Sequence, residues 1–231
     1  MIKYLEWDSN FFNLKIGKVE LNDKSNISLD EIISDKYDLI YVFNYSSFKN
    51  KILLNETNID TKINYSIPLE GFSLRIIKTN LVESKDVFTI TEINELIILT
   101  IASGVYSRFS IDKKFQNDSF ERLYTYWLKS SLDNESKKIF FVKLKNKIIG
   151  LLILKLHDEH SIIEILSVSK EYRGQGIASD LVSSAINFSL IKNKKIINVS
   201  TQKDNIIACD FYESNGFVKI NEIEIFHLWT K

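Results

Sequence analysis

Arg173-Gly174-Gln175-Gly176-Ile177-Ala178 is the stretch of this sequence that decides the fold. It stands between a β-rich run that ends at Val168 and a pattern of apolar residues at helical spacing that continues to about Ile191. Glycine lets the backbone turn tightly and lets a ligand approach without meeting a Cβ atom. The first turn of a helix leaves backbone N–H groups unpaired and carries a partial positive charge. The pattern therefore predicts a strand, a loop and a helix whose start binds a phosphate or pyrophosphate.

Two interpretations of this loop are open when its glycines are taken alone. Short glycine motifs match by chance, and this one is neither the dinucleotide-binding fingerprint nor the P-loop pattern. The alternative is therefore a strand–helix turn that binds no ligand. Arg173 adds a forked, permanently charged donor, which favours the anion-binding interpretation.

The segments around the loop predict a mixed sheet flanked by helices. Apolar residues at helical spacing predict helices over 91–102, from Asp118 or Ser119 onward, over 176–191 and over 205–214. Runs of β-forming residues predict strands at 139–144, 148–156, 162–168, 196–200 and 217–229, the first two forming a hairpin. The expected fold class is therefore α/β (α+β), with a mixed central sheet.

The first third of the chain predicts a smaller α/β unit. Strands are expected at 15–21, 38–43, 63–69 and 72–77, the last two joined through the turn-forming residues Pro68 and Gly71. Ser46 and Ser47 indicate the start of a short helix that runs to about Leu54. We expect a small N-terminal domain over residues 1–82 and a second domain, which carries the loop, over residues 83–231.

The composition is that of a folded soluble protein, with 45% hydrophobic and 26% charged residues. Lys+Arg and Asp+Glu number 30 each, so no overall field attracts nucleic acid or an anionic membrane. Cys209 is the single cysteine, which excludes an intramolecular disulfide and fits a reducing compartment. No apolar run is long enough to span a bilayer or to act as a signal peptide. We expect a cytoplasmic protein with no nucleic-acid or membrane partner.

The stretch from Glu171 to Ala178 resembles motif A of the GNAT acetyltransferase superfamily, whose pattern is Gln/Arg-x-x-Gly-x-Gly/Ala. Arg173, Gly176 and Ala178 occupy its fixed positions. The resemblance implies that residues 83–231 form an acyl-CoA-binding catalytic domain with the GNAT fold. It implies that backbone N–H groups of the loop hold the pyrophosphate of acetyl-CoA or of another short acyl-CoA.

The resemblance also assigns roles to residues outside the loop. The strand that carries Leu166 and Val168 would lie along the pantetheine arm, and a backbone N–H there would polarise the thioester carbonyl. The residues from 201 to 217 resemble motif B, in which an Asn at a helix start contacts coenzyme A and a Tyr protonates the departing thiolate. By position these are Asn205 and Tyr212.

Tyr212 suits the role of proton donor. A thiol has a reference pKa near ~8.5 and a tyrosine one near ~10, so the tyrosine stays protonated at neutral pH and can donate its proton. The alternative is that Tyr212 is a core aromatic beside Phe211.

The base that takes the proton from the amine is less well defined. Glu164 lies four residues before Val168, on the same face of the strand by two-residue alternation, and is a candidate base, acting directly or through water. The alternative is that Glu164 is an exposed or ion-paired strand carboxylate. His157, His160 and His227 have no convincing metal-ligand context, so no metal is expected. Cys209 lacks an activating base nearby in sequence, so no covalent intermediate is expected.

A second resemblance concerns the acceptor. The segment from Leu5 to Gly17, together with Ser107-Arg108-Phe109 and the residues around Trp127, resembles bacterial TDP-fucosamine acetyltransferases. Those enzymes acetylate the 4-amino group of a TDP-linked amino-dideoxy sugar. The resemblance implies a role in cell-surface polysaccharide biosynthesis, and a homodimer is plausible on the same ground.

The candidate acceptor residues each have a structural alternative. Arg108 suits a diphosphate and Phe109 suits a base or sugar face; otherwise Arg108 forms a buried ion pair and Phe109 fills the core. In the resembling family the strand placed at 63–69 tends to carry an acidic residue near its start. Asn64 stands there in this chain and cannot act as a base, so the alignment is shifted, Glu164 or water takes the role, or the acceptor differs.

The expected activity is the transfer of an acetyl or short acyl group from acyl-CoA to the amine of a dTDP-linked amino-dideoxy sugar. The amine would attack the thioester directly in a ternary complex. Two alternatives remain: a GNAT enzyme acting on a peptide, polyamine or antibiotic, and a non-catalytic acyl-CoA-binding module.

Overall fold

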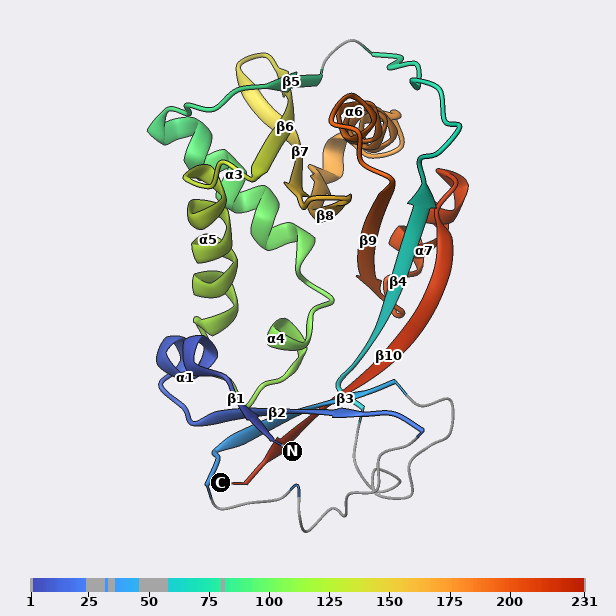
Figure 1. The fold of residues 1–231 in the computed structure, drawn as a ribbon. Helices are drawn as coiled ribbons and strands as arrows, with labels where there is room; N and C mark the ends of the chain where they lie inside the picture. The colour runs from blue at the N-terminus through green and yellow to red at the C-terminus, as the bar shows by residue number, and fades with distance from the viewer. Residues whose placement is uncertain (1, 24–31, 33–35, 46–57, 80–81, 231) are drawn as a thin grey trace.

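The computed structural model describes residues 2–23, 32, 36–45, 58–79 and 82–230, which form a ten-stranded sheet (Figure 1). In order across the sheet the strands are β1 (Lys3–Tyr4), β2 (Ile16–Leu21), β3 (Leu39–Asn44), β10 (Val218–Trp229), β4 (Asp60–Pro68), β9 (Ile196–Gln202), β8 (His160–Val168), β7 (Lys147–Leu156), β6 (Lys137–Leu144) and β5 (Val82–Ser84). β2 pairs with β3 and β8 pairs with β9 in parallel, and the other neighbours are antiparallel. The predicted mixed sheet is confirmed.

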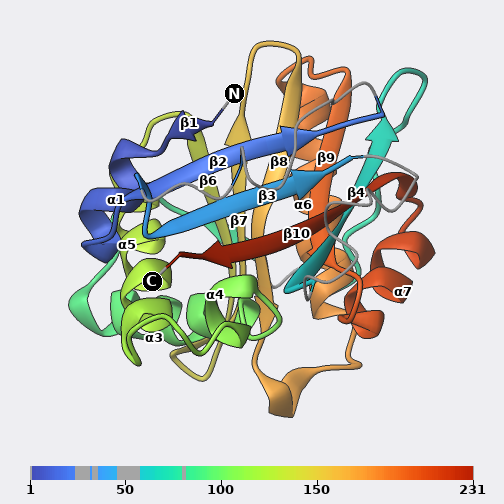
Figure 2. The ribbon, with the colours of Figure 1, turned by 90° about the horizontal axis from the view of Figure 1, so that it is seen from below.

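Helices cover both faces of this sheet. α3 (Ile90–Ser103) and α5 (Ser119–Leu132) pack on one face of the central strands, and α6 (Ile177–Ile191) packs on the other, with α7 (Ile206–Ser214) beside β9 and β10. α1 (Glu6–Phe12) and the short α4 (Arg108–Ile111) join the aromatic cluster between α5 and β3. Seen from below, β2, β3 and β10 cross the direction of β6 to β9 (Figure 2). None of the helices in the described ranges is long and apolar enough to cross a membrane.

Most predicted elements are present within one to three residues of their expected bounds. The hairpin between β6 and β7 turns through Lys145 and Asn146, both with positive φ (49° and 64°). α3 begins with a capping box in which Thr89 accepts a bond from the backbone N–H of Glu92 and Glu92 accepts one from that of Thr89. Local sequence signals therefore determine where these elements begin and end.

The first third of the chain differs from its predicted elements in two places, and a third prediction lies outside the described residues. The strand predicted at 72–77 is wrong, because this segment is irregular and exposes Phe72 and Ile76. Its backbone is satisfied by α6 instead: Asn187 accepts a bond from the Arg75 N–H at 2.7 Å and donates one to the Arg75 carbonyl at 2.9 Å. The helix predicted from Ser46 lies outside the described residues. α1, which is only seven residues long, was not predicted.

β8 and β9 pair over only part of their length. Pairing begins with His160 opposite Ile196 and ends with Ile163 opposite Val199. The register of β8 against β7 shifts between Ile163 and Ile165, which makes Glu164 the extra residue of a β-bulge. Beyond the bulge β8 forms no described pair with β9, so a gap in the ladder opens on the side of α6 and α7.

The sheet is continuous across the predicted domain boundary. β10 lies between β3 and β4, so the strands of residues 1–82 are interleaved with one from residues 83–231. The division at residue 82 stays a prediction.

Candidate functional site

The glycine-rich loop has the conformation that its sequence predicts. Gly174 and Gly176 both have positive φ (76° and 82°), and Gly176 is the N-terminal cap of α6. Arg173 is exposed, and its Nε donates to the carbonyl of Val168 at 3.0 Å. That bond ties the loop to the end of β8. The buried Ile177 anchors the first turn of α6 in the core, so the loop is held firmly with its backbone open to solvent.

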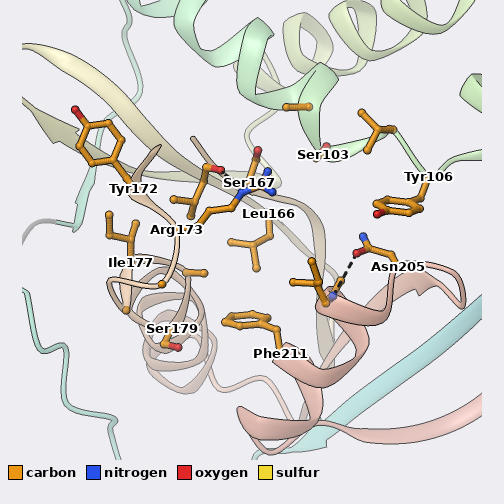
Figure 3. Close-up of a pocket in the computed structure, with 18 residues that line it drawn as sticks. Ser103, Tyr106, Leu166, Ser167, Tyr172, Arg173, Ile177, Ser179, Asn205 and Phe211 are labelled. Carbon is orange, nitrogen blue, oxygen red and sulfur yellow. Dashed lines mark hydrogen bonds between the residues drawn. The ribbon is translucent and has the colours of Figure 1, made fainter. Parts of the chain in front are cut away.

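A cavity of about 380 Å³ adjoins this loop. Figure 3 shows that its walls come from β8, the loop and start of α6, the start of α7 and the end of α3. The predicted cofactor residues that line it are Leu166, Val168, Arg173, Gly174, Gly176, Ile177, Ala178 and Asn205. Gln175 is exposed and does not line it. The structure therefore brings residues from two separate motifs to one cavity.

Several lining residues were not predicted. Phe211 on α7 and Tyr172 before the loop add aromatic walls, and Ser103 and Tyr106 approach from α3 and the segment after it (Figure 3). Phe211 was interpreted only as a neighbour of Tyr212 in the core. Successive helix residues point about 100° apart, so Phe211 faces this cavity while Tyr212 does not.

Asn205 caps α7 and lines the cavity at the same time. Its Oδ1 accepts a bond from the Ala208 N–H at 3.3 Å, shown as the dashed line in Figure 3. This bond fixes the side chain at the cavity mouth and leaves its amide donors available to a ligand.

A second cavity, of about 120 Å³, is lined by residues of β8 and β9 beside the bulge and shares Ser103, Leu166, Asn205 and Ala208 with the first. Tyr212 lines it together with Tyr124, Trp127, Glu164 and Gln202. Two cavities that meet at the unpaired end of β8 can hold two substrates with their reacting groups side by side.

Tyr212 has the features of both roles considered for it, a core aromatic and a proton donor. Its ring packs in the core against Phe217 and Tyr65, with centroids 5.5 and 6.1 Å away, and 6% of the side chain is exposed. Burial raises the pKa of Tyr212 above its ordinary value, so the phenol is protonated over the whole physiological range. The residue can donate a proton into the second cavity, which it lines.

Of the two predicted bases, Glu164 lines the second cavity and Asn64 does not. Glu164 forms an ion pair with Lys137 at 2.5 Å, and the bulge breaks the two-residue alternation that grouped it with Val168. Asn64 donates to Asn221 and accepts from Ser200, both at 2.7 Å, and lines neither cavity. A catalytic role for either residue stays a prediction.

Asp60 is an acidic residue that the sequence reasoning missed. β4 begins at Asp60, three residues earlier than predicted, so an acidic residue stands at the start of this strand. Its carboxyl is buried, which raises the pKa of Asp60 to about 6 in spite of Arg108 and Lys62 nearby. A side-chain hydrogen bond joins it to Gln202, which lines the second cavity.

Ser107, Arg108 and Phe109 lie together at α4 but line neither cavity. Phe109 is 9% exposed and belongs to the aromatic cluster around Phe12 and Phe115. The buried ion pair that was the alternative for Arg108 is not formed with any described carboxylate. Their contacts with an acceptor stay predictions.

Comparison with known proteins agrees with this geometry. The model of the Acetyltransferase (GNAT) family matches residues 105–217. Spore coat polysaccharide biosynthesis protein SpsD of Bacillus subtilis is 23% identical over 53% of this chain and 43% of its own length. Streptothricin acetyltransferase A of the same species is 27% identical over 46% of this chain and 58% of its own length. The chain thus spans about half the length of these relatives.

The fold has solved counterparts. A GCN5-related N-acetyltransferase from Sphaerobacter thermophilus superposes with a TM-score of 0.58 and 12% identity, over 84% of this chain and 61% of that one. At this identity the likeness concerns the fold alone, and it agrees with the mixed sheet and flanking helices described above.

Proposed function

We propose that the chain, whose residues 105–217 match the model of the Acetyltransferase (GNAT) family, transfers an acetyl group from acetyl-CoA to the amine of a nucleotide-linked amino sugar. The observation that carries the proposal is the pair of adjoining cavities, with the glycine-rich loop beside the first and Tyr212 in the wall of the second. Acetyl-CoA supplies an activated thioester. The residues of the chain hold it, orient the amine and move the protons.

The first cavity suits coenzyme A. The start of α6 presents unpaired N–H groups to its pyrophosphate, as a helix N-terminus does for anions. The backbone of β8 beyond the bulge pairs with β7 but has no partner on β9, so an N–H group directed away from β7 could bind the pantetheine arm or polarise the thioester carbonyl. Asn205 is placed to bind the same arm. Tyr212 then donates its proton to the leaving thiolate.

Among the described carboxylates, Asp60 is suited to accept the proton of the amine through water, since its hydrogen bond to Gln202 connects it to the wall of the second cavity. Because the pKa of Asp60 is raised to about 6, its carboxylate is a stronger base than an ordinary aspartate and is still ionised at pH 7. As pH falls through about 6, Asp60 becomes protonated and kcat/KM is expected to fall with it. Asp60→Asn is expected to remove this limb of the pH profile and to lower kcat at pH 7 by at least about tenfold.

The control for this prediction is Asp86→Asn, which removes an exposed carboxylate outside both cavities. The folded pKa of Asp60 lies above its unfolded value, so ionised Asp60 destabilises the native state above about pH 6. Asp60→Asn should therefore not lower the melting temperature. If kcat/KM of Asp60→Asn still falls as the pH drops through about 6, the base is another group.

The second cavity suits the amino sugar, since Tyr124 and Trp127 provide ring surfaces and Gln202 a polar contact. The relative named for spore coat polysaccharide biosynthesis supports a sugar acceptor. The relative named for streptothricin supports the alternative, an antibiotic amine. Incubation with acetyl-CoA and each amine, followed by measurement of free thiol, separates the two. Thiol release with streptothricin and with no TDP-linked amino sugar would overturn the sugar assignment.

Gly104 provides a test of the acceptor side. A Cβ atom at Gly104 would lie 2.2 Å from the Tyr124 ring, so Gly104→Ala is expected to displace that ring from the wall of the second cavity. The KM for the acceptor should rise about tenfold, equivalent to about 1.4 kcal/mol, with the KM for acetyl-CoA nearly unchanged. Initial-rate kinetics with each substrate varied in turn measures both constants. An unchanged acceptor KM would place the amine elsewhere.

A further inference from the structure

One face of the sheet gathers positive charge beside the second cavity. Residues opposite each other in neighbouring strands share a face, as do residues two apart in one strand. Lys18 of β2 lies opposite Tyr41 of β3, and Phe43 is two residues further along β3. On β4, Lys62 lies opposite Gln202, which lines the second cavity. The common face follows from the register, because Ile225 of β10 lies opposite both Phe43 and Asp60.

Arg108 of α4 reaches onto this face. Its Cζ lies 4.5 Å from the ring centroid of Tyr41 and 5.2 Å from that of Phe43. The Nζ of Lys18 lies 4.4 Å from the same Phe43 ring. Aromatic rings stabilise a guanidinium but do not neutralise its charge. Lys18 is paired with Glu20 at 2.6 Å, and Asp60 lies on the same face, so Arg108 and Lys62 together leave this face an excess of positive charge.

Arg108 and Lys62 form no direct ion pair among the described residues, although Asp60 lies near both cations and Asp8 lies near Arg108. Neither has a carboxylate within the 4.0 Å limit of an ion pair, and neither donates a described hydrogen bond. The Nε of Arg108 is buried with no partner, although the side chain as a whole is half-buried. Burial and the charge of Arg108 lower the pKa of Lys62. A buried guanidinium nitrogen without a hydrogen-bond partner is costly, and an anion bound beside Arg108 would supply that partner.

We infer that Arg108 and Lys62 form an oxyanion-binding subsite that holds a phosphate or diphosphate group of the acceptor, with Lys18 at its edge. The guanidinium supplies the forked donors that match a phosphate, and the lysine supplies a point charge. Neighbouring strands lie about 5 Å apart, so an acceptor whose amine occupies the second cavity would place its phosphate one strand beyond Gln202. The inference rests on the proposed acceptor site and adds Lys62 and Lys18 to its recognition.

Direct binding tests the subsite without turnover. Inorganic pyrophosphate is titrated calorimetrically into the protein saturated with coenzyme A, so that the loop at Gly176 is already filled. We expect Lys62→Gln and Arg108→Lys each to weaken pyrophosphate binding about tenfold, as loss of one charge-assisted contact of about 1.4 kcal/mol would. The matched control is Lys147→Gln, which removes an exposed charge in the β6–β7 hairpin and should bind as the wild type does.

Two further binding measurements identify the chemical class of the ligand. TDP should compete with the acceptor but not with acetyl-CoA, and malonate, a dicarboxylate, should bind more weakly than pyrophosphate. Equal affinity of Lys62→Gln and Lys147→Gln for pyrophosphate overturns the subsite, and malonate binding as tightly as pyrophosphate overturns its assignment to phosphate. If Arg108→Lys loses its affinity for coenzyme A or its cooperative melting, Lys62→Gln carries the test. Pyrophosphate binding without acetylation of any amino sugar would reject the proposed function and keep the subsite.

Discussion

Replacing Tyr212 by phenylalanine is expected to lower kcat by about 10²–10⁴, the range for loss of a general acid. The thiolate must then leave without the proton that Tyr212 donates from the wall of the second cavity. The aromatic ring stays, so its packing against Tyr65 and Phe217 and the melting temperature should be nearly unchanged. Initial rates of thiol release, with both substrates saturating, measure the effect.

The control for this variant is Tyr126→Phe, which removes an exposed phenol on α5 outside both cavities. KM for acetyl-CoA should be similar in wild type and Tyr212→Phe, because the change affects a group that acts in the transition state. A Tyr212→Phe enzyme with the kcat of the wild type would leave Tyr212 as a core residue only.

Gly176→Val is expected to weaken coenzyme A binding about a hundredfold, equivalent to about 2.7 kcal/mol. The φ of 82° at Gly176 is unfavourable for any side chain and most unfavourable for a β-branched one. No atom lies within 4 Å of the position that a Cβ would take, so the valine would project into the space that the pyrophosphate needs. Calorimetric titration with coenzyme A measures the loss.

Gly71→Val separates backbone strain from loss of the binding space. Gly71 also has a positive φ (74°) and an open Cβ position, but it lies in an exposed turn after β4, outside both cavities. Both variants should lose a similar amount of stability, about 1–3 kcal/mol, and only Gly176→Val should lose affinity. Equal coenzyme A affinity in the two variants would contradict a pyrophosphate site at the start of α6.

The half of the site around coenzyme A could be predicted from the sequence because its signals are local. The glycines, Arg173 and the first turn of α6 are contiguous in sequence. Asn205 and Tyr212 belong to the same helix, since Asn205 caps α7 and Tyr212 lies within it. Each element has its own start and stop signals, so the spacing alone brings the right groups to one place. Gln175 shows the limit, since its place in the motif does not bring it to the cavity.

The acceptor half could not be predicted in the same way because its residues meet through strand pairing. Asp60 and Lys62 are placed by the register of β4 against β9 and β10, and Arg108 by packing against rings from β3. A shift of one residue in a strand reverses which face a side chain takes. The bulge at Glu164 and the early start of β4 were invisible in the sequence pattern, and both determine which carboxylate is a candidate base.

The position of β10 between β3 and β4 has a consequence for how the protein is made. β10 follows every other strand in the described chain. During synthesis β3 and β4 therefore emerge long before β10, the strand that pairs with both. Contacts of such long sequence separation form slowly. The coenzyme A loop with α6 and α7 is complete before β10 emerges, whereas the face that carries Asp60 and Lys62 is complete only afterwards. We therefore expect a nascent chain that can bind coenzyme A before it can recognise an acceptor.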